Sequence, residues 1–160
     1  MTITQYNTHV TNQADGLYRF VYHNINDEEQ AKDIVQDTFE RFWVNKEKVL
    51  EGKAKSYLFT TAYRRMIDVL RKEKRIARLD EVKVEPLYKE TTPDLKQLLY
   101  QALDTLPEMQ RIVVLLRDLE GYDYREIGTI TNLTESQVKV YIFRARATLR
   151  ERLVSVETII

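Results

Sequence analysis

The chain of 160 residues has no cysteine, only 4 glycines and 3 prolines, and no long apolar run. The absence of cysteine excludes disulfide bonds and thiolate metal sites. Its two histidines, His9 and His23, are isolated, which argues against a transition-metal site. So few helix breakers favour helices over turn-rich β structure. Without a transmembrane run or a signal-like N-terminal core, we expect a cytoplasmic protein with no membrane insertion.

Sequence patterns typical of enzymes are also missing. There is no Ser-His-Asp or Cys-His set, and neither a phosphate-loop nor a dinucleotide-binding glycine motif occurs. Asp33 and Asp37 stand one helical turn apart, but no third ligand accompanies them to hold a metal. We therefore expect no catalytic residues, no metal and no cofactor.

The charges balance overall but are segregated along the chain. With 25 basic and 25 acidic residues the net charge is zero, which argues against a protein that coats DNA by bulk electrostatics. However, residues 27–40 carry six acidic side chains against a single lysine, and residues 53–78 carry nine basic side chains against Asp68 and Glu73. Such blocks predict two partner surfaces, one for a basic protein and one for phosphates.

Apolar periodicity predicts an all-α protein. Helices are expected at residues 13–23, from a cap at Asn26 to about 44, at about 54–75, at 94–103, and at 107–119 with Pro107 in the first position and Gly121 at the end. Residues 76–93 lose the periodicity and contain Pro86 and Pro93, which indicates a linker. The prediction is two small helical domains, residues 1–76 and 94–160, joined by a linker at 77–93.

The C-terminal third reads as a helix-turn-helix. A short amphipathic helix at 124–130 and a turn at 131–133 precede a long helix, which Thr134 and Gln137 open as a capping box. One stripe of the long helix is apolar (Val138, Ile142, Ala145, Leu149 and Leu153), and the cations largely lie off it (Lys139, Arg144, Arg146 and Arg150). A solvated charged face is the simpler interpretation of such a helix. The preceding helix and turn favour docking in the major groove of DNA.

Four blocks of sequence, taken in order, carry a family resemblance. They are residues 33–43 (DIVQDTFERFW), 56–71 (SYLFTTA through IDVLR), 102–107 (ALDTLP) and 138–146 (VKV with FRAR). Together they resemble the sigma-70 family of bacterial RNA polymerase sigma factors, in the two-domain extracytoplasmic-function type. The resemblance covers about residues 15–153.

The resemblance implies a transcription initiation factor. Such a protein binds core RNA polymerase, directs it to specific promoter DNA and aids strand opening, and its further partner would be an anti-sigma factor. The alternative is a stand-alone helix-turn-helix regulator, which leaves the acidic block and the basic third helix without a role. A helical adaptor that binds only protein conflicts with the basic recognition helix.

The family's polymerase-docking helix falls on the acidic block. The implied contact residues share one exposed face at helical spacings: Asp33, Gln36, Asp37 and Glu40. Without the family context, a solvated face explains them equally well. Trp43 at the end of the block fits either the core or the interface.

The family's promoter-melting helix falls on the basic block. Melting requires a pocket for a flipped base, aromatic faces for stacking and cations for the exposed strand. The loop at 45–55 is expected to supply the pocket, and the implied downstream-element residues are Lys53, Lys55, Tyr57, Tyr63, Arg64, Arg65, Arg71 and Lys72. Tyr57 stands where the family often has Trp and fits a half-buried core position equally well. Arg64 stands where the family often has Asn.

The family's upstream-element contacts fall on the opening turns of the last helix. They are Thr134, Ser136, Gln137, Lys139, Val140, Phe143 and Arg144. Gln can read adenine and Arg can read guanine through paired hydrogen bonds. Val140 and Tyr141 replace a common Ser-Arg pair, so the family's upstream sequence does not transfer. Phe143 has the core as a competing location.

Overall fold

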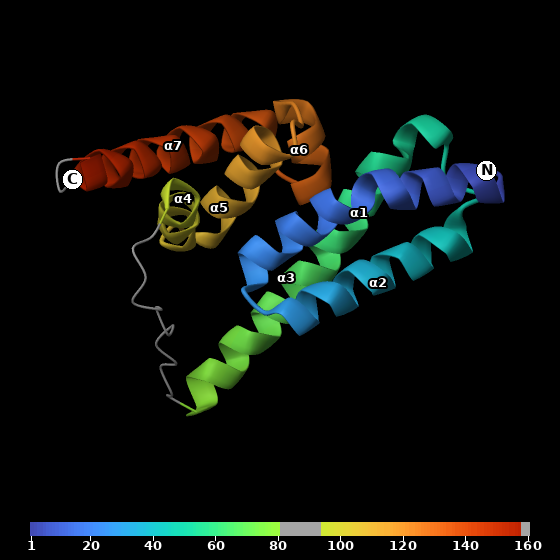
Figure 1. Ribbon diagram of the computed structural model, residues 1–160, viewed down its shortest axis with the longest axis horizontal. Coiled ribbons are helices and arrows are strands. Elements are labelled where there is room, and N and C mark those ends of the chain that lie inside the picture. The colour runs from blue at the N-terminus through green and yellow to red at the C-terminus, as the bar shows by residue number, and fades with distance from the viewer. Residues whose placement is uncertain (81–93, 158–160) are drawn as a thin grey trace.

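The computed structural model describes residues 1–80 and 94–157, and its regular elements there are all helical. Three long helices form the first unit: α1 (Ile3–Ile25), α2 (Glu28–Asn45) and α3 (Ala54–Asp80), with a short turn of helix, η1 (Glu51–Lys53), before α3. The second unit holds α4 (Leu95–Asp104), α5 (Glu108–Val114), η2 (Leu115–Leu119), α6 (Tyr124–Thr131) and α7 (Glu135–Glu157). Figure 1 shows the two units on either side of the molecule. The expected all-α fold with a C-terminal helix-turn-helix is confirmed.

The first helix begins earlier than its apolar pattern indicates. Thr2 and Gln5 form a capping box at its start, so α1 runs from Ile3 rather than from about residue 13. At its other end Asn26 adopts a left-handed conformation with φ of 58°, which Asn tolerates well. Asp27, in extended conformation, accepts a hydrogen bond from the Gln30 amide and caps α2. The prediction that Asn26 caps the second helix is therefore wrong, because Asn26 closes the first.

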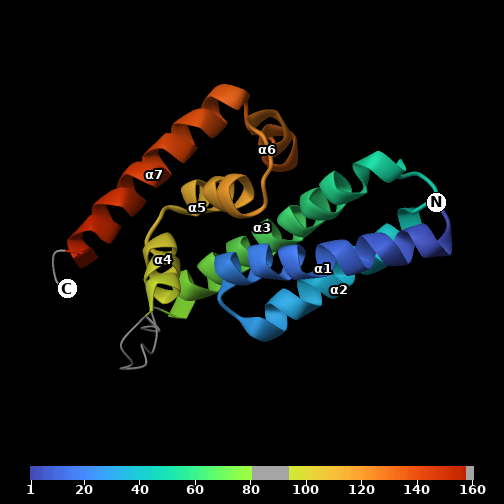
Figure 2. The same cartoon turned by 45° about the horizontal axis from the view of Figure 1, so that its top comes forward.

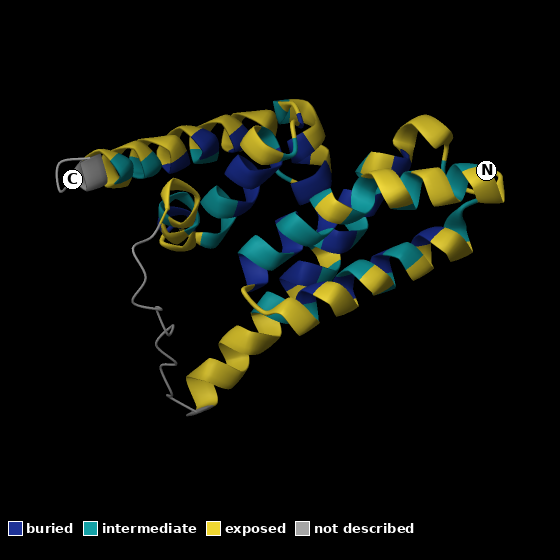
Figure 3. Cartoon of the chain, viewed as in Figure 1, coloured by how far each residue is buried: buried dark blue, intermediate teal, exposed yellow. Residues whose placement is uncertain are grey.

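The core of the first unit forms where α1, α2 and α3 meet. Its largest fully buried side chains are Leu17, Phe20, Phe42, Leu58, Phe59 and Met66. Val35 and Phe39 of α2 pack against this core but are only half-buried. The third helix was expected to end near residue 75 but continues to Asp80, and side chains 71–79 are all exposed (Figure 3).

The second unit contains a widened turn that shapes the chain before the helix-turn-helix. After α5, residues 115–119 form a π-helical turn in which the Glu120 amide donates to the Leu115 carbonyl, five residues back. Gly121 then turns the chain with φ of 77°, a conformation that glycine adopts without strain. Glu120 and Tyr122, on either side of Gly121, both contact the first unit, at Arg19 and at Phe59. π-Helical turns occur often at functional sites.

The helix-turn-helix forms largely as its sequence predicts. Asp123 caps α6, and Asn132 ends it in a left-handed conformation with φ of 59°. The Gln137 amide donates to the Thr134 hydroxyl, and the Thr134 amide donates to the Gln137 side chain, which confirms the capping box. At the turn, Gly128 lies against the Leu133 carbonyl oxygen, and a Cβ at Gly128 would stand 2.8 Å from that atom. Only glycine allows this close approach.

The two units pack against each other through α1 and α3 on one side and α4 to α6 on the other (Figure 2). The central contact is Glu120, whose side chain is 5% exposed and accepts two hydrogen bonds from Arg19, at 3.0 and 3.1 Å. Beside it the ring of Tyr122 meets Phe59 edge-on at 5.3 Å. Apolar and charged contacts thus both hold the units together.

A second group of contacts joins the end of α1 to α4 and α5. Arg111 donates to the side chain of Asn24, itself 3% exposed, at 2.9 Å. Burial lowers the pKa of Arg111. The ring of His23 stacks on Tyr100 with centroids 3.7 Å apart. Burial, together with Arg19 and Lys96 nearby, lowers the pKa of His23 to about 4, so this imidazole is neutral at pH 7.

Candidate nucleic-acid and protein interfaces

The acidic face of α2 is present, although its four members differ in their surroundings. Asp33, Gln36 and Glu40 are exposed, and the Gln36 amide lies 3.4 Å from the Glu40 carboxylate. Asp37 is half-buried, with 31% of its side chain exposed. Three of the four predicted docking residues therefore offer free polar atoms to a partner.

Asp37 instead faces α3. Its carboxylate lies 2.6 Å from Nε of Arg65, and Arg41 of α2 approaches it at 3.8 Å. Arg65 is one of the predicted downstream-element residues, so this ion pair joins the acidic face to the basic helix. From the sequence, Asp37 and Arg65 were predicted to belong to two separate surfaces.

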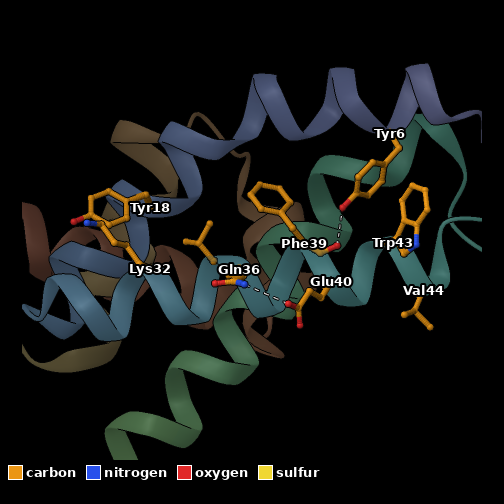
Figure 4. Close-up of a pocket in the computed structure, with 9 residues that line it drawn as sticks. Tyr6, Tyr18, Lys32, Gln36, Phe39, Glu40, Trp43 and Val44 are labelled. Atoms are coloured by element: carbon orange, nitrogen blue, oxygen red, sulfur yellow. Dashed lines mark hydrogen bonds between the residues drawn. The ribbon is translucent and has the colours of Figure 1, made fainter.

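An apolar groove of about 710 Å³ adjoins the acidic face between α1 and α2 (Figure 4). Its wall is aromatic and aliphatic, and Gln36 and Glu40 stand on its edge; the apolar lining is Tyr6, Tyr18, Val35, Phe39, Trp43 and Val44. Tyr6 holds the wall together by donating to the Phe39 carbonyl at 2.9 Å. Trp43 is 42% exposed and packs edge-on against Tyr6, so it lies at the surface rather than in the core. The sequence did not predict this groove, because Tyr6 lies in a part of α1 that precedes the helix expected from about residue 13.

A second hollow, of about 610 Å³, lies between the loop after α2 and the first turns of α3. It brings together three predicted downstream-element residues, Lys53, Tyr57 and Arg64. Asn45, Lys48 and Thr60 also line it and were not predicted individually. Ser56, Tyr57, Thr60 and Arg64 recur at helical spacing, a signal that would have placed Thr60 in the site.

Tyr57 is fixed at the rim of this hollow. Its hydroxyl lies 3.2 Å from the side-chain amide of Asn45 and 3.4 Å from the Arg41 carbonyl. Its ring tilts against Phe42 at 5.9 Å. Tyr57 is thus half-buried and also lines the hollow. A half-buried core position and a place in the site were the two alternatives left open by the sequence, and both describe it.

Two predicted downstream-element residues lie on a different face of α3, under the second unit. Lys55 donates to the Glu120 carbonyl at 3.2 Å and lies over the ring of Tyr122. Tyr63 is half-buried, with its hydroxyl 3.9 Å from the sulfur of Met109. Burial raises the pKa of Tyr63. The structure therefore does not bring Lys55 and Tyr63 into the hollow with Lys53, Tyr57 and Arg64.

The two remaining members of the predicted set, Arg71 and Lys72, are exposed on the second half of α3. They follow Arg64 by two helical turns, about 11 Å along the axis. Arg71 and Lys72 therefore lie beyond the hollow rather than in it.

All seven predicted upstream-element residues are exposed on the surface of the helix-turn-helix: Thr134, Ser136, Gln137, Lys139, Val140, Phe143 and Arg144. The opposite stripe of α7 is buried at Val138, Ile142 and Ala145. Phe143 is 75% exposed, so the core location that the sequence left open for it does not apply. Arg146, off the apolar stripe, is held by Asp118 in a paired contact at 2.6 and 3.3 Å.

A third hollow, of about 420 Å³, lies between Tyr124 of α6 and the exposed side of α7. Its lining combines cations with the edge of Phe143; the cationic members are Lys139, Arg146 and Arg150. Arg146 is held by Asp118 at 2.6 Å and Lys139 lies 3.7 Å from Glu135, so an anionic group such as a phosphate would compete with these two carboxylates for the cations.

Other kinds of site find no support in residues 1–80 and 94–157. No group of three or more His, Cys, Asp or Glu side chains there is arranged to hold a metal ion. In the same residues, no helix has the length and apolar character needed to cross a membrane.

Comparison with known proteins gives a consistent result. Residues 10–76 match the family described as Sigma-70 region 2, and residues 96–149 match Sigma-70, region 4. The chain is 30% identical over 148 residues to the RNA polymerase sigma factor SigV of Bacillus subtilis, covering 91% of this chain and 89% of SigV. It is 28% identical over 140 residues to the ECF RNA polymerase sigma factor SigM of the same organism, covering 84% and 86%.

Solved structures share the fold. The sigma factor RpoE of Bartonella quintana, solved in complex with the anti-sigma factor NepR, superposes with a TM-score of 0.81 at 24% identity. That superposition covers 94% of this chain and 98% of RpoE. CnrH, solved with the cytosolic domain of CnrY, superposes with a TM-score of 0.69 at 21% identity, covering 94% of this chain and 88% of CnrH.

Proposed function

Because this chain belongs to the sigma-70 family of RNA polymerase sigma factors, in its extracytoplasmic-function type, we propose a role for each of its surfaces in transcription initiation. The chain is an initiation factor that directs core RNA polymerase to specific promoters and aids DNA strand opening. A stand-alone helix-turn-helix regulator would need only the second unit, whereas the chain matches both family regions.

Three further properties are part of the proposal. The factor has no catalytic activity of its own, it acts in the cytoplasm, and an anti-sigma factor binds it. The last point is supported by RpoE, which was solved in complex with an anti-sigma factor.

The acidic face of α2 docks on the polymerase in this proposal. Its exposed carboxylates suit a basic partner surface, and the adjoining groove offers apolar area beside them. Asp33→Lys and Glu40→Lys should each weaken binding to core polymerase in a competition assay. Glu28→Lys makes the same charge change on α2 at about 140° from Asp33, so it should bind as the parent does. Binding that is equal for all three variants would contradict the docking assignment.

Asp37 is a poor probe of this interface. A lysine at position 37 would stand against Arg65, 2.6 Å from the present carboxylate, and would disturb the packing of α2 on α3. Loss of binding in an Asp37 variant would therefore mix docking with folding. Asp33 and Glu40 are free of such contacts with α3 and separate the two effects.

The hollow lined by Lys53, Tyr57 and Arg64 carries the proposal for strand opening. With Lys48 included, it combines an aromatic ring, three cations and enough volume for a flipped base at one exposed site. A single strand held there would continue past Arg71 and Lys72 on the exposed half of α3. Tyr57 is already held by Asn45 and Arg41, so little ordering is needed when a base arrives.

Strand opening is tested by comparing two arginines of the same helix. Arg64→Ala removes a lining residue of the hollow, whereas Arg75→Ala removes an exposed arginine beyond it. With core polymerase, Arg64→Ala should lower open-complex formation more than closed-complex formation, and a pre-melted bubble template should recover much of the loss. Arg75→Ala should change both steps little. A loss from Arg64→Ala that is equal on duplex and bubble would mean that Arg64 supplies only general affinity.

The exposed face of α7 reads the upstream promoter element in this proposal. Its residues project from the second helix of a helix-turn-helix, the element that enters the major groove in this motif. Lys139, Arg146 and Arg150 around the third hollow are suited to the adjacent phosphates.

A further inference from the structure

The outermost surface of α7 is apolar, although the helix as a whole is basic. Phe143 is 75% exposed and Val140 is 44% exposed, while the buried stripe lies on the other side at Val138 and Ile142. Neither exposed side chain contributes to the core. Two neighbouring apolar side chains exposed on a basic helix suggest a ligand with a small apolar group.

Helical geometry places this pair on a narrow ridge. At 100° per residue, Val140 and Phe143 fall within about 60° of each other, together with Ser136 and Ala147, and the ridge points away from the buried stripe. Lys139 and Arg150 border it on one side, where Lys139 also lies 3.7 Å from Glu135, and Arg144 borders it on the other, where Glu151 follows two turns later. The ridge is therefore small and apolar at its centre and cationic at both edges.

DNA in the major groove matches this arrangement. The floor of that groove carries one apolar group, the C5 methyl of thymine, and phosphates line both walls. A helix laid along the groove would bring its ridge to the base edges and its two cationic borders to the two backbones. A purely apolar protein partner would leave those borders unpaired, so the charge pattern favours DNA.

We propose that Val140 and Phe143 read thymine methyl groups in the upstream element, an inference that rests on the proposed role of α7 in reading that element. Val140 replaces the serine common in the family, so a polar contact gives way to an apolar one at this position. The element read by this chain should accordingly contain thymine at one or two positions facing the ridge.

The test removes the methyl group from the DNA and the side chain from the protein in turn. The upstream element is first selected with core polymerase and the full chain from duplexes randomised across that region. Each thymine is then replaced singly by deoxyuridine, which lacks only the C5 methyl. For the parent, one or two of these replacements should weaken binding about fourfold each, the ratio expected for one buried methyl group.

The protein variants give the second arm. Phe143→Ala or Val140→Ala should abolish the uracil effect at one position, because the side chain that contacts that methyl is gone. Both positions are exposed, so the variants should fold, and circular dichroism checks this. Leu79→Ala removes an exposed apolar side chain on α3, 83% exposed, and should leave the uracil effect unchanged.

The outcomes separate this inference from the proposed function. If no uracil replacement matters, or if the selected element has no thymine, while Arg144→Ala still weakens binding, α7 reads DNA but not through methyl groups. If neither the deoxyuridine replacements, nor Arg144→Ala, nor Lys139→Ala changes binding to the upstream element, the proposed role of α7 is itself wrong. If Phe143→Ala weakens only binding to core polymerase without DNA, the ridge is a protein contact, and the inference is overturned.

Discussion

The contact between Arg19 and Glu120 makes a quantitative prediction about how firmly the two units hold together. Glu120→Gln keeps the shape of the side chain but removes its charge and one accepting oxygen. Truncating one partner of a fully buried pair costs about 3–5 kcal/mol, whereas an exposed pair contributes about 0–1 kcal/mol. Glu120 is 5% exposed but Arg19 is 41% exposed, so water can solvate the freed arginine. We expect a loss of about 1–2 kcal/mol in the contact between the units, a factor of about 5 to 30 in the ratio of separated to joined molecules.

The absence of cysteine makes this ratio measurable. Cysteines introduced by Glu29→Cys on α2 and Glu151→Cys on α7, both exposed positions, would be the only two thiols in the chain and can carry a pair of fluorescent labels. Energy transfer between them should fall in Glu120→Gln. Glu28→Gln, which removes an exposed ion pair with Lys32 on α2, is the matched control and should leave it unchanged. The same change in both variants would refute the reasoning.

Gly16 supplies an independent check on the same contact. A Cβ at this position would stand 2.9 Å from the Glu120 carboxylate, so Gly16→Ala must displace that side chain. Replacing glycine by alanine inside a helix otherwise stabilises by about 0.5–1 kcal/mol. Gly16→Ala should therefore stabilise the Glu120→Ala background more than the parent, as measured by urea unfolding. An equal effect in the two backgrounds would show that Glu120 does not occupy this space.

Two further predictions concern folding stability. The pKa of His23 is about 4 in the folded chain and near its ordinary value of 6.5 when the chain is unfolded. Between these values the unfolded chain binds more protons, so stability should fall as pH drops from about 6.5 towards 4. His23→Gln should remove this part of the pH dependence of the urea midpoint, and parallel pH curves for parent and variant would refute the prediction. Gly128→Ala places a Cβ 2.8 Å from the Leu133 carbonyl oxygen, a backbone atom that cannot move aside. The substitution should therefore destabilise the chain by about 1–3 kcal/mol, despite the better helix propensity of alanine. Thr129→Ala, at an exposed position on the same helix, should change stability by less than about 0.5 kcal/mol in the same urea titration.

Local features of the fold could be predicted where one residue type has one physical role. The Thr134–Gln137 capping box and the turn at Gly121 follow from short-range chemistry, and the structure has both. Of the predicted stripe of α7, Val138, Ile142 and Ala145 are buried, whereas Leu149 and Leu153 are half-buried. The cap between α1 and α2 was misplaced by one residue, because Asn and Asp both suit helix ends and only the backbone decides which of them turns left-handed. Residues 3–12 were left out of the predicted helix, although Ile3, Tyr6, Val10 and Ala14 lead to Leu17 at spacings of three and four residues.

Contacts between distant residues explain what the sequence could not show about the candidate sites. Whether Asp37 offers its charge to a partner or to Arg65 depends on how α2 lies across α3, which neither helix encodes alone. Lys55 and Tyr63 share a basic helix with Arg64, but a different face of that helix meets the second unit. The hollow around Tyr57 forms because the loop at 46–53 folds back towards α3. Loops carry little periodic signal, so the sequence could not show this.

The position of Lys55 and Tyr63 under the second unit makes DNA and the second unit competitors for the same atoms. Tyr63 is half-buried against Met109, and the exposed Lys55 must release the Glu120 carbonyl before it can bind a strand. A ligand that needs both side chains therefore favours separated molecules. Its apparent dissociation constant is then the intrinsic value divided by the separated fraction. For every 1.4 kcal/mol by which the joined state is favoured, the apparent affinity falls about tenfold below the intrinsic one. Titrations of the free chain with a single strand would therefore report chiefly on Arg19, Glu120 and Tyr122, none of which touches the strand.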